Sequence, residues 1–277
     1  RELIEGGSGP ATAAMTPGRQ SQSMYKHLTI ERNGVIARLW LDRPDKLNAL
    51  APATLAELTA AAEAFNDDPA IRVVVIGGRG RAFSAGADLE GFPGPGEPGI
   101  RPAADAGRLM ADALEKMDAV TIARIHGWCV GGGVVLAAAC DLRVAESGAR
   151  FAIPEVDLGI HLAWGGIPRL VREIGPALTR ELVITCRPFD AEEARRAGFL
   201  NRVVERDDLD REVDELARQV AAKPSLPVTA TKRHVDAVTA AMVGTGRAWS
   251  DADGLVAALQ DAECNTVREA YVAAKLK

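Results

Sequence analysis

The chain has 277 residues, of which 47% are hydrophobic and 26% are charged, and its formal net charge is −5. This composition is typical of a globular protein, and the length suits one large domain with or without an appendage. A mildly acidic chain without a basic block gives no electrostatic signal for nucleic acid, and its apolar runs are too short to span a bilayer. We therefore expect no nucleic-acid partner and no membrane segment.

The four cysteines, Cys129, Cys140, Cys186 and Cys264, are far apart, and none forms a C-x-x-C pair. Each lies in or beside an apolar stretch, as expected of reduced, buried thiols. The N-terminus shows no charged-then-apolar segment with a cleavage site. We therefore expect a cytoplasmic protein without disulfides and without a metal site.

The first half of the chain alternates between predicted strands and helices. Residues 1–23 are rich in Gly, Ser, Pro, Ala and Thr without a period, which predicts a disordered tail. Residues 27–42 hold two alternating runs joined by Asn33-Gly34, which predict a hairpin. Apolar residues recur at helical spacing over residues 51–68, with Pro52 near the start.

A β-branched run ended by glycines, residues 71–80, predicts a strand buried on both faces. Residues 90–105 are dense in glycine and proline, which predicts a mobile loop without regular structure. Two further strands are expected at residues 120–127 and 140–146. They flank an apolar helix that is opened by Gly131–Gly133.

After Phe151 the patterns become mainly helical, with one further strand signal at Leu200–Val204. Long amphipathic helices near a C-terminus can cover their own core or pack on a neighbouring subunit, and the sequence leaves both open. The predicted helical stretches are residues 175–185, 190–198, 206–223, 226–242 and 251–276.

Two glycine-containing turns could present backbone amides to a ligand. In the first, small residues at Ser84–Ala87 precede Asp88; Ala82 takes the place of the first glycine of a G-x-S-x-G nucleophile elbow, which argues against a serine hydrolase. In the second, Gly131–Gly133 opens a helix whose first N–H groups lack internal partners. An ordinary turn and close helix packing are the alternatives, but together the turns indicate two donors for one oxyanion.

Five segments of the chain occur in a characteristic order, namely residues 41–50, 73–89, 125–145, 149–160 and 165–204. Together they resemble the enoyl-CoA hydratase/isomerase (crotonase) superfamily. The resemblance implies an α/β fold in which residues 24–205 form a crotonase-like spiral of ββα units. It implies a C-terminal helical region, residues 206–277, that builds a homotrimer or a hexamer. The expected substrate is an acyl-CoA thioester, with no further cofactor.

The same resemblance assigns roles by position. The N–H groups of Ala85 and Gly132 would form the oxyanion hole for the thioester carbonyl, and Lys275 or Lys277 of a neighbouring subunit would lie near the CoA phosphates. Further residues would line the CoA or the acyl pocket, namely Lys46, Leu47, Ala87, Asp88, Leu89, Gly131, Val135 and Trp164.

One expected carboxylate is missing. Hydratases of this superfamily use two glutamates, and Glu155 matches the second, but the first position is Val135. A single carboxylate can still move a proton between two carbons, as the superfamily's Δ3,Δ2-enoyl-CoA isomerases do. We therefore expect an enzyme of hydratase/isomerase type in which isomerisation is favoured and hydration is slow. The alternative is a weakly catalytic protein that binds CoA esters or a protein partner.

No other acid clearly replaces the missing glutamate. Asp157 would point away from the site if the segment is extended. A lone loop histidine such as His161 is more often structural than catalytic. Ala163 stands where the superfamily's dienoyl-CoA isomerases carry an aspartate, which argues against that activity, and His126 is expected to be structural.

Overall fold

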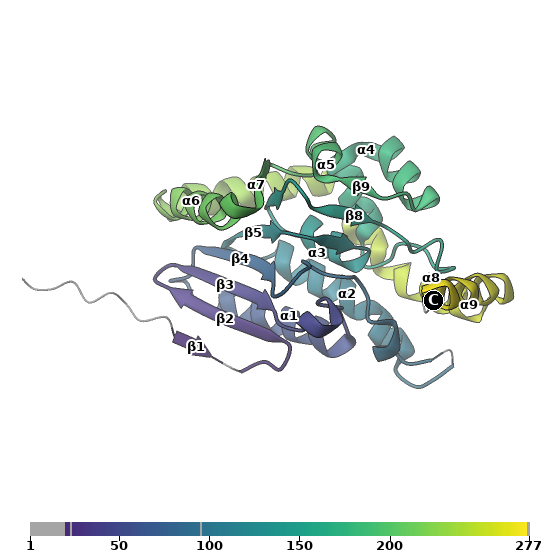
Figure 1. The fold of residues 1–277 in the computed structure, drawn as a ribbon. Helices are drawn as coiled ribbons and strands as arrows, with labels where there is room; N and C mark the ends of the chain where they lie inside the picture. The colour runs from purple at the N-terminus through teal and green to yellow at the C-terminus, as the bar shows by residue number, and fades with distance from the viewer. Residues whose placement is uncertain (1–19, 23, 95, 276–277) are drawn as a thin grey trace, which may run out of the picture.

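A large mixed sheet runs through the centre of the molecule (Figure 1). The computed structural model describes residues 20–22, 24–94 and 96–275. Strands β3, β4, β5, β7 and β10 are parallel, while β1 and β2 are antiparallel additions at one edge. In spatial order the strands are β1 Gln20–Gln22, β2 Leu28–Asn33, β3 Ile36–Leu41, β4 Val73–Gly78, β5 Val120–Ile125, β7 Leu142–Glu146 and β10 Arg202–Val204.

A second, smaller sheet makes the fold a spiral. It contains β6 (Trp128–Val130), β8 (Arg150–Ala152) and β9 (Phe189–Asp190). The chain passes from β5 to β6 and then into α3 (Gly132–Ala138), and from β7 to β8 and then into α4 (Gly166–Thr185). Each turn thus places one strand in each sheet before its helix, which confirms the predicted ββα spiral.

Strand β4 is buried along its whole length, as its β-branched run predicts. Val73 and Val75 pack with α6 (Leu209–Ala221) on one face of the sheet. Val74 belongs to the main core on the opposite face, to which α1 (Pro52–Asn66) contributes. The alternation of a strand explains why the two clusters divide neighbouring residues between them.

The predicted hairpin is confirmed as β2 and β3, but its turn lies one residue later than expected. Asn33 pairs with Ile36, so Gly34 and Val35 are the two turn residues. Gly34 has φ +59°. A two-residue hairpin turn with glycine first matches the twist of the flanking strands.

The prediction of an irregular segment over residues 90–105 is wrong at its C-terminal end. Helix α2 spans Ile100–Glu115 and begins after Gly99, which has φ +87°. Pro102 lies in the first turn of this helix, where an N–H would have no intrahelical acceptor. Proline there removes no hydrogen bond, so the composition that suggested a loop is compatible with a helix start.

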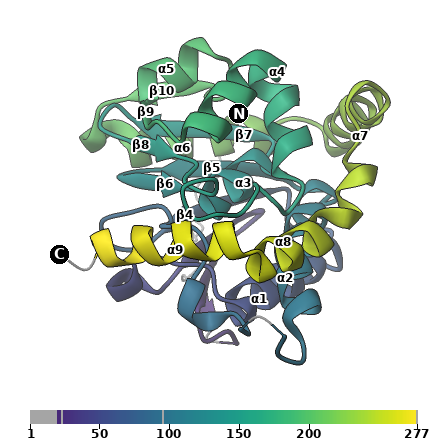
Figure 2. The ribbon, with the colours of Figure 1, turned by 90° about the vertical axis from the view of Figure 1, so that its right-hand side faces the viewer.

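The C-terminal helices have different surroundings (Figure 2). Helix α6 covers the large sheet, whereas α7 stands apart and Lys232 is its one buried residue among those described. Helix α8 packs against α2 and is followed by α9, and both lie toward the viewer in Figure 2. The remaining bounds are α5 Ala191–Arg196, α7 Ser225–Met242, α8 Asp251–Gln260 and α9 Ala262–Lys275.

Most of the predicted disordered tail, residues 1–23, lies outside the described residues. Gln20–Gln22 form strand β1 and pair with β2, so the prediction of irregular chain is wrong for these three residues. Among the helices that the structure describes, none is long and apolar enough to cross a membrane.

Candidate active site

An apolar cavity of about 240 Å³ lies beside the N-terminus of α3. Its walls come from the turn after β4, from α2 and α3, from the loop after β8 and from α8 and α9. Six of the predicted site residues line it, namely Ala87, Leu89, Gly132, Val135, Glu155 and Trp164.

Glu155 is the one carboxyl group among the described residues that line this cavity. The residue as a whole is half-buried, but its carboxyl group is enclosed, and Oε2 has no hydrogen-bond partner among the described residues. Burial raises the pKa of Glu155 from 4.5 to about 7, because the charged form loses its hydration without gaining a cation. The group can therefore both take up and release a proton near neutral pH.

Gly131 makes room for this carboxyl group. A Cβ atom at Gly131 would overlap Oε1 of Glu155, and the backbone of Gly131 has φ +49° and ψ −113°, which strongly favours glycine. Its own N–H donates to the carbonyl of Ala152 at 2.9 Å. Gly132 is then the first residue of α3 and lines the cavity, and its N–H has no intrahelical acceptor.

The predicted donor Ala85 is not available to a substrate. Its N–H donates to the carbonyl of Leu47 at 2.9 Å, and Ala85 does not line the cavity. Two residues on, Ala87 lines the cavity, and its N–H donates to no acceptor among the described residues. A Cβ atom at Gly86 would lie 3.4 Å from the amide nitrogen of Gly132, so the two turns are adjacent. Of these two residues, therefore, only Ala87 both lines the cavity and has an N–H without an acceptor among the described residues.

Ser84 has no features of a nucleophile. It is fully buried, and its Oγ donates to the carbonyl of Asn48 at 2.9 Å and accepts from the Gly86 N–H at 3.2 Å. The side chain thus fixes the turn that presents Ala87. His126 is also structural, as predicted: it is buried, with Nε2 2.9 Å from the Gly80 carbonyl, and burial lowers its pKa.

The residues predicted to bind CoA do not all meet at the cavity. Lys46 is exposed and pairs with Glu90 at 3.1 Å, and Asp88 pairs with Arg43 at 2.8 Å. Leu47 contributes its backbone to the turn that holds Ala85. These groups therefore lie outside the cavity lining, and only their neighbours Ala87 and Leu89 reach it.

Trp164 and Val135 form apolar walls of the cavity, as predicted for an acyl pocket. The indole of Trp164 stacks on Phe92 with ring centroids 6.3 Å apart. Val135 is buried, and a Cβ atom at Gly166 would lie only 2.9 Å from its Cγ2. No titratable group therefore stands at the position where a second glutamate was sought.

The other candidates from the sequence fall into two groups. His161 and Ala163 line the cavity, and His161 packs against Gly254 of α8. Asp157 is exposed, and it does not line the cavity. Nothing is described of the side chain of Lys275, and Lys277 lies outside the described residues.

Sequence reasoning missed the walls that come from α2 and from the C-terminal helices. Ile100 and Ala104 of α2 stand four residues apart, as do Leu255 and Leu259 of α8, and each pair lines the cavity. The spacing of four, which places residues on one helical face, was a usable signal for both pairs. Arg268 of α9 also lines the cavity and had no such signal.

The fold and this site agree with a comparison to known families. Residues 31–274 match the family model described as enoyl-CoA hydratase/isomerase, and the chain belongs to this family. The protein is accordingly an enzyme of enoyl-CoA hydratase/isomerase type that acts on acyl-CoA.

Individual relatives and structures agree with this membership. The chain is 36% identical to crotonyl-CoA hydratase of Syntrophomonas wolfei over 241 residues, which cover 86% of this chain and 92% of the relative. It is 39% identical to carnitinyl-CoA dehydratase of Salmonella typhi over 213 residues, or 76% and 80% of the two chains. The crystal structure of enoyl-CoA hydratase from Bacillus anthracis is similar with a TM-score of 0.73 and 31% identity, covering 76% of this chain and 83% of that one.

Proposed function

We propose that the protein isomerises 3-enoyl-CoA thioesters to 2-enoyl-CoA thioesters with Glu155 as its single acid and base. The observation that carries this proposal is an isolated carboxyl group, of pKa about 7, in a cavity where Val135 stands at the position of a second carboxylate. Moving one proton between two carbons needs one group that accepts and then donates it.

The amides of Ala87 and Gly132 would hold the thioester oxygen during this transfer. The Glu155 carboxylate takes a proton from the α-carbon, and the electrons of that C–H bond form a dienolate whose oxygen accepts hydrogen bonds from the two N–H groups. The neutral Glu155 then returns its proton to the γ-carbon, which leaves the double bond between the α- and β-carbons. The reaction is balanced without a metal or a further cofactor.

Hydration is the second candidate, because relatives such as the crotonyl-CoA hydratase carry that activity in their names. Water addition requires a water molecule to be held and deprotonated while the α-carbon is protonated. Glu155 alone would have to serve both steps, and loss of one general acid or base typically costs about 10²–10⁴-fold in rate. We therefore expect hydration to be the slower reaction of this protein.

Product identification by NMR tests the two candidates directly. Purified protein is incubated with a 3-enoyl-CoA, and the products are followed over time. A 2-enoyl product that gains little water supports the isomerase. A 3-hydroxyacyl product as the main outcome would replace it with the hydratase. Unchanged substrate that still binds would favour a CoA-ester-binding role.

We also propose that α7 packs against further copies of this chain in a homotrimer or a hexamer. The helix exposes four apolar side chains, with Leu226 81% and Met242 77% exposed, together with Val235 and Val238. Val235, Val238 and Met242 recur at a spacing of three and four, which places them on one face of the helix, and an exposed apolar face of this kind is typical of an interface. Light scattering coupled to gel filtration should give at least three times the chain mass, and a monomer would contradict the proposal.

A further inference from the structure

The backbone at Trp164 adopts a conformation that bulky residues rarely take. Its φ angle is +61°, in the left-handed region, although it is not glycine. Such a conformation persists only when the surrounding structure holds it, and it often marks a functional position. The indole is buried and lines the acyl cavity.

Two glycines on different helices leave the space that the indole fills. A Cβ atom at Gly107 of α2 or at Gly132 of α3 would overlap the ring of Trp164. The ring is therefore wedged between α2 and α3 and lies against the residue whose N–H is proposed to hold the thioester oxygen. Its position sets both the width of the cavity and the space beside that N–H.

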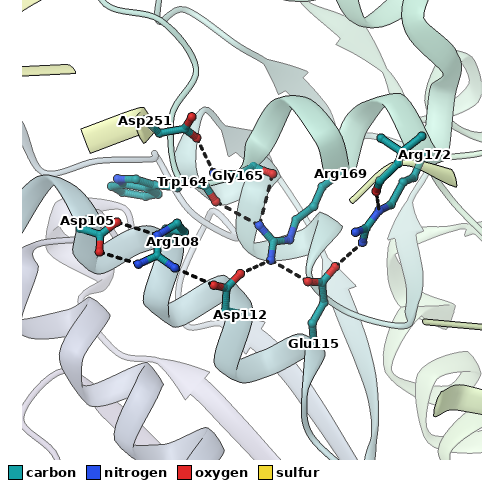
Figure 3. A network of polar contacts seen from close by, with 10 residues as sticks. Asp105, Arg108, Asp112, Glu115, Trp164, Gly165, Arg169, Arg172 and Asp251 are labelled. Carbon is teal, nitrogen blue, oxygen red and sulfur yellow. Dashed lines mark hydrogen bonds and ion pairs between the residues drawn. The ribbon is translucent and has the colours of Figure 1, made fainter. Parts of the chain in front are cut away.

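The Trp164–Gly165 segment is held from both sides (Figure 3). Nη1 of Arg169 donates to the carbonyl of Trp164 at 3.1 Å and to the carbonyl of Gly165 at 3.2 Å. From α8, Oδ2 of Asp251 accepts a hydrogen bond from the Gly165 N–H at 2.8 Å. These contacts fix the peptide planes on either side of Gly165 and so fix the direction of the indole.

Arg169 is itself fixed by carboxylates of α2. Its side chain is 1% exposed, and Nη2 donates to Oδ1 of Asp112 at 2.9 Å and to Oε2 of Glu115 at 2.7 Å. Arg108 and Arg172 pair with the outer oxygens of these carboxylates at 2.9 Å and 2.6 Å. A guanidinium that spans two carbonyls and two carboxylates has one orientation, which a lysine cannot reproduce.

We propose that Trp164 limits the size of the acyl group that the site accepts and that Arg169, oriented by Asp112 and Glu115, is the positioning residue that holds Trp164 in place. We call these four residues the Trp164 clamp. The proposal rests on the acyl-CoA function argued above and adds to it a preference for short acyl groups.

The test measures kcat/KM for a six-carbon and a twelve-carbon 3-enoyl-CoA and uses their ratio. Trp164→Ala should raise the long-to-short ratio by about tenfold or more, since the indole no longer limits the cavity. Arg169→Lys keeps the charge but loses the planar guanidinium that donates from two nitrogens, so we expect a smaller rise in the same ratio. Either variant with the parent ratio would overturn the proposal for that residue.

Arg172→Gln is the matched control. Arg172 shares Glu115 with Arg169, but its other contact is the Val243 carbonyl at 2.7 Å rather than the Trp164 segment. Arg172→Gln should lower the unfolding temperature and leave the long-to-short ratio of kcat/KM unchanged. If Arg169→Lys and Arg172→Gln lower stability alike and neither moves the ratio, the network is structural only and the proposal fails.

Binding gives a second readout for variants that lose turnover. Calorimetry measures the binding of the saturated six-carbon and twelve-carbon acyl-CoA thioesters, which are not turned over. Trp164→Ala should shift the binding preference toward the twelve-carbon thioester. If the parent protein turns over the short substrate but the variants keep the parent preference in both assays, this inference alone is overturned. A parent that neither binds nor turns over either thioester overturns the proposed function, and this inference with it.

Discussion

Glu155 and Arg169 are both enclosed, but their surroundings differ in one respect that separates their roles. Oε2 of Glu155 has no partner among the described residues, and burial raises the pKa of Glu155 to about 7. Nε of Arg169 also lacks a partner among the described residues, but its Nη atoms donate to two carbonyls and two carboxylates, so its charge is compensated. An unpaired buried acid is poised to exchange a proton, whereas a paired guanidinium keeps its charge and fixes geometry. The comparison teaches that hydrogen-bond and charge partners, more than burial, distinguish a group that reacts from a group that positions its neighbours.

The two regions meet in one segment of chain. Glu155 lies near the start of the loop between β8 and α4, and Trp164 lies near its end, where Arg169 holds it. A single loop therefore carries the proposed proton-transfer group and the wall that limits the substrate. Mutations at one end are expected to affect chemistry and at the other end selectivity.

The largest expected effect comes from removing the unpaired charge. Glu155→Gln should lower the isomerisation rate by about 10²–10⁴-fold, because no other carboxyl group lines the cavity among the described residues. Binding of a saturated acyl-CoA, measured by calorimetry, should stay near the parent value. A variant that turns over as fast as the parent would remove Glu155 from the mechanism and end the contrast with Arg169.

The same substitution should change the pH dependence of stability. Between pH 4.5 and about 7 the native Glu155 holds a proton that the unfolded chain has released, so its contribution to stability falls as the pH rises through this window. The shift from 4.5 to about 7 corresponds to about 3 kcal/mol at most. Glu155→Gln should therefore gain stability over the parent on going from pH 4.5 to 8, measured by urea unfolding. A difference independent of pH would contradict the raised pKa.

A second carboxyl group at position 135, now occupied by Val135, would sharpen the comparison by giving Glu155 an acidic neighbour in the cavity. Val135→Glu should raise the hydration of a 2-enoyl-CoA by about tenfold or more, because two groups can then share the water and the proton. Val135→Gln is the control of matched size without the charge. Equal hydration by the two folded variants would mean that the cavity does not hold a water molecule in a reactive position.

The smallest effect on stability is expected from an exposed pair outside the cavity. Lys46 pairs with Glu90, and both side chains are more than half exposed. Lys46→Ala should change the free energy of unfolding by less than about 0.5 kcal/mol. If Lys46 contacts the CoA as the resemblance implies, KM should rise while kcat stays constant. An unchanged KM would remove Lys46 from the binding site.

Local patterns predicted much of the framework because they follow from the period of each element. The hairpin at β2 and β3, the buried strand β4 and the helix opened by Gly132 are each visible in the printed chain. Prediction failed where proline and glycine suggested a loop at Ile100–Asp105. Proline interrupts a helix in its interior, but in the first turn it removes no hydrogen bond.

The candidate site was predicted less completely. Glu155, Gly132 and Val135 were identified by their place relative to the glycine triplet and the Pro-Glu turn, and all three line the cavity. The resemblance assigned the donor to Ala85 and placed Ala87 in the CoA lining, and a sequence does not show which amide in a turn is already bonded. The carbonyl that takes up the Ala85 N–H belongs to Leu47, which is distant in the chain.

The sequence by itself determined the elements, the order of the motifs and the presence of one glutamate where the family resemblance implies two. These depend on residue type and spacing along the chain. Only the tertiary structure decided that, among the described residues, Oε2 of Glu155 and the N–H of Ala87 have no partner, and that Arg169 holds Trp164 beside Gly107 and Gly132. Each of these depends on contacts between segments far apart in the chain, and neither the period of a helix nor that of a strand encodes such contacts.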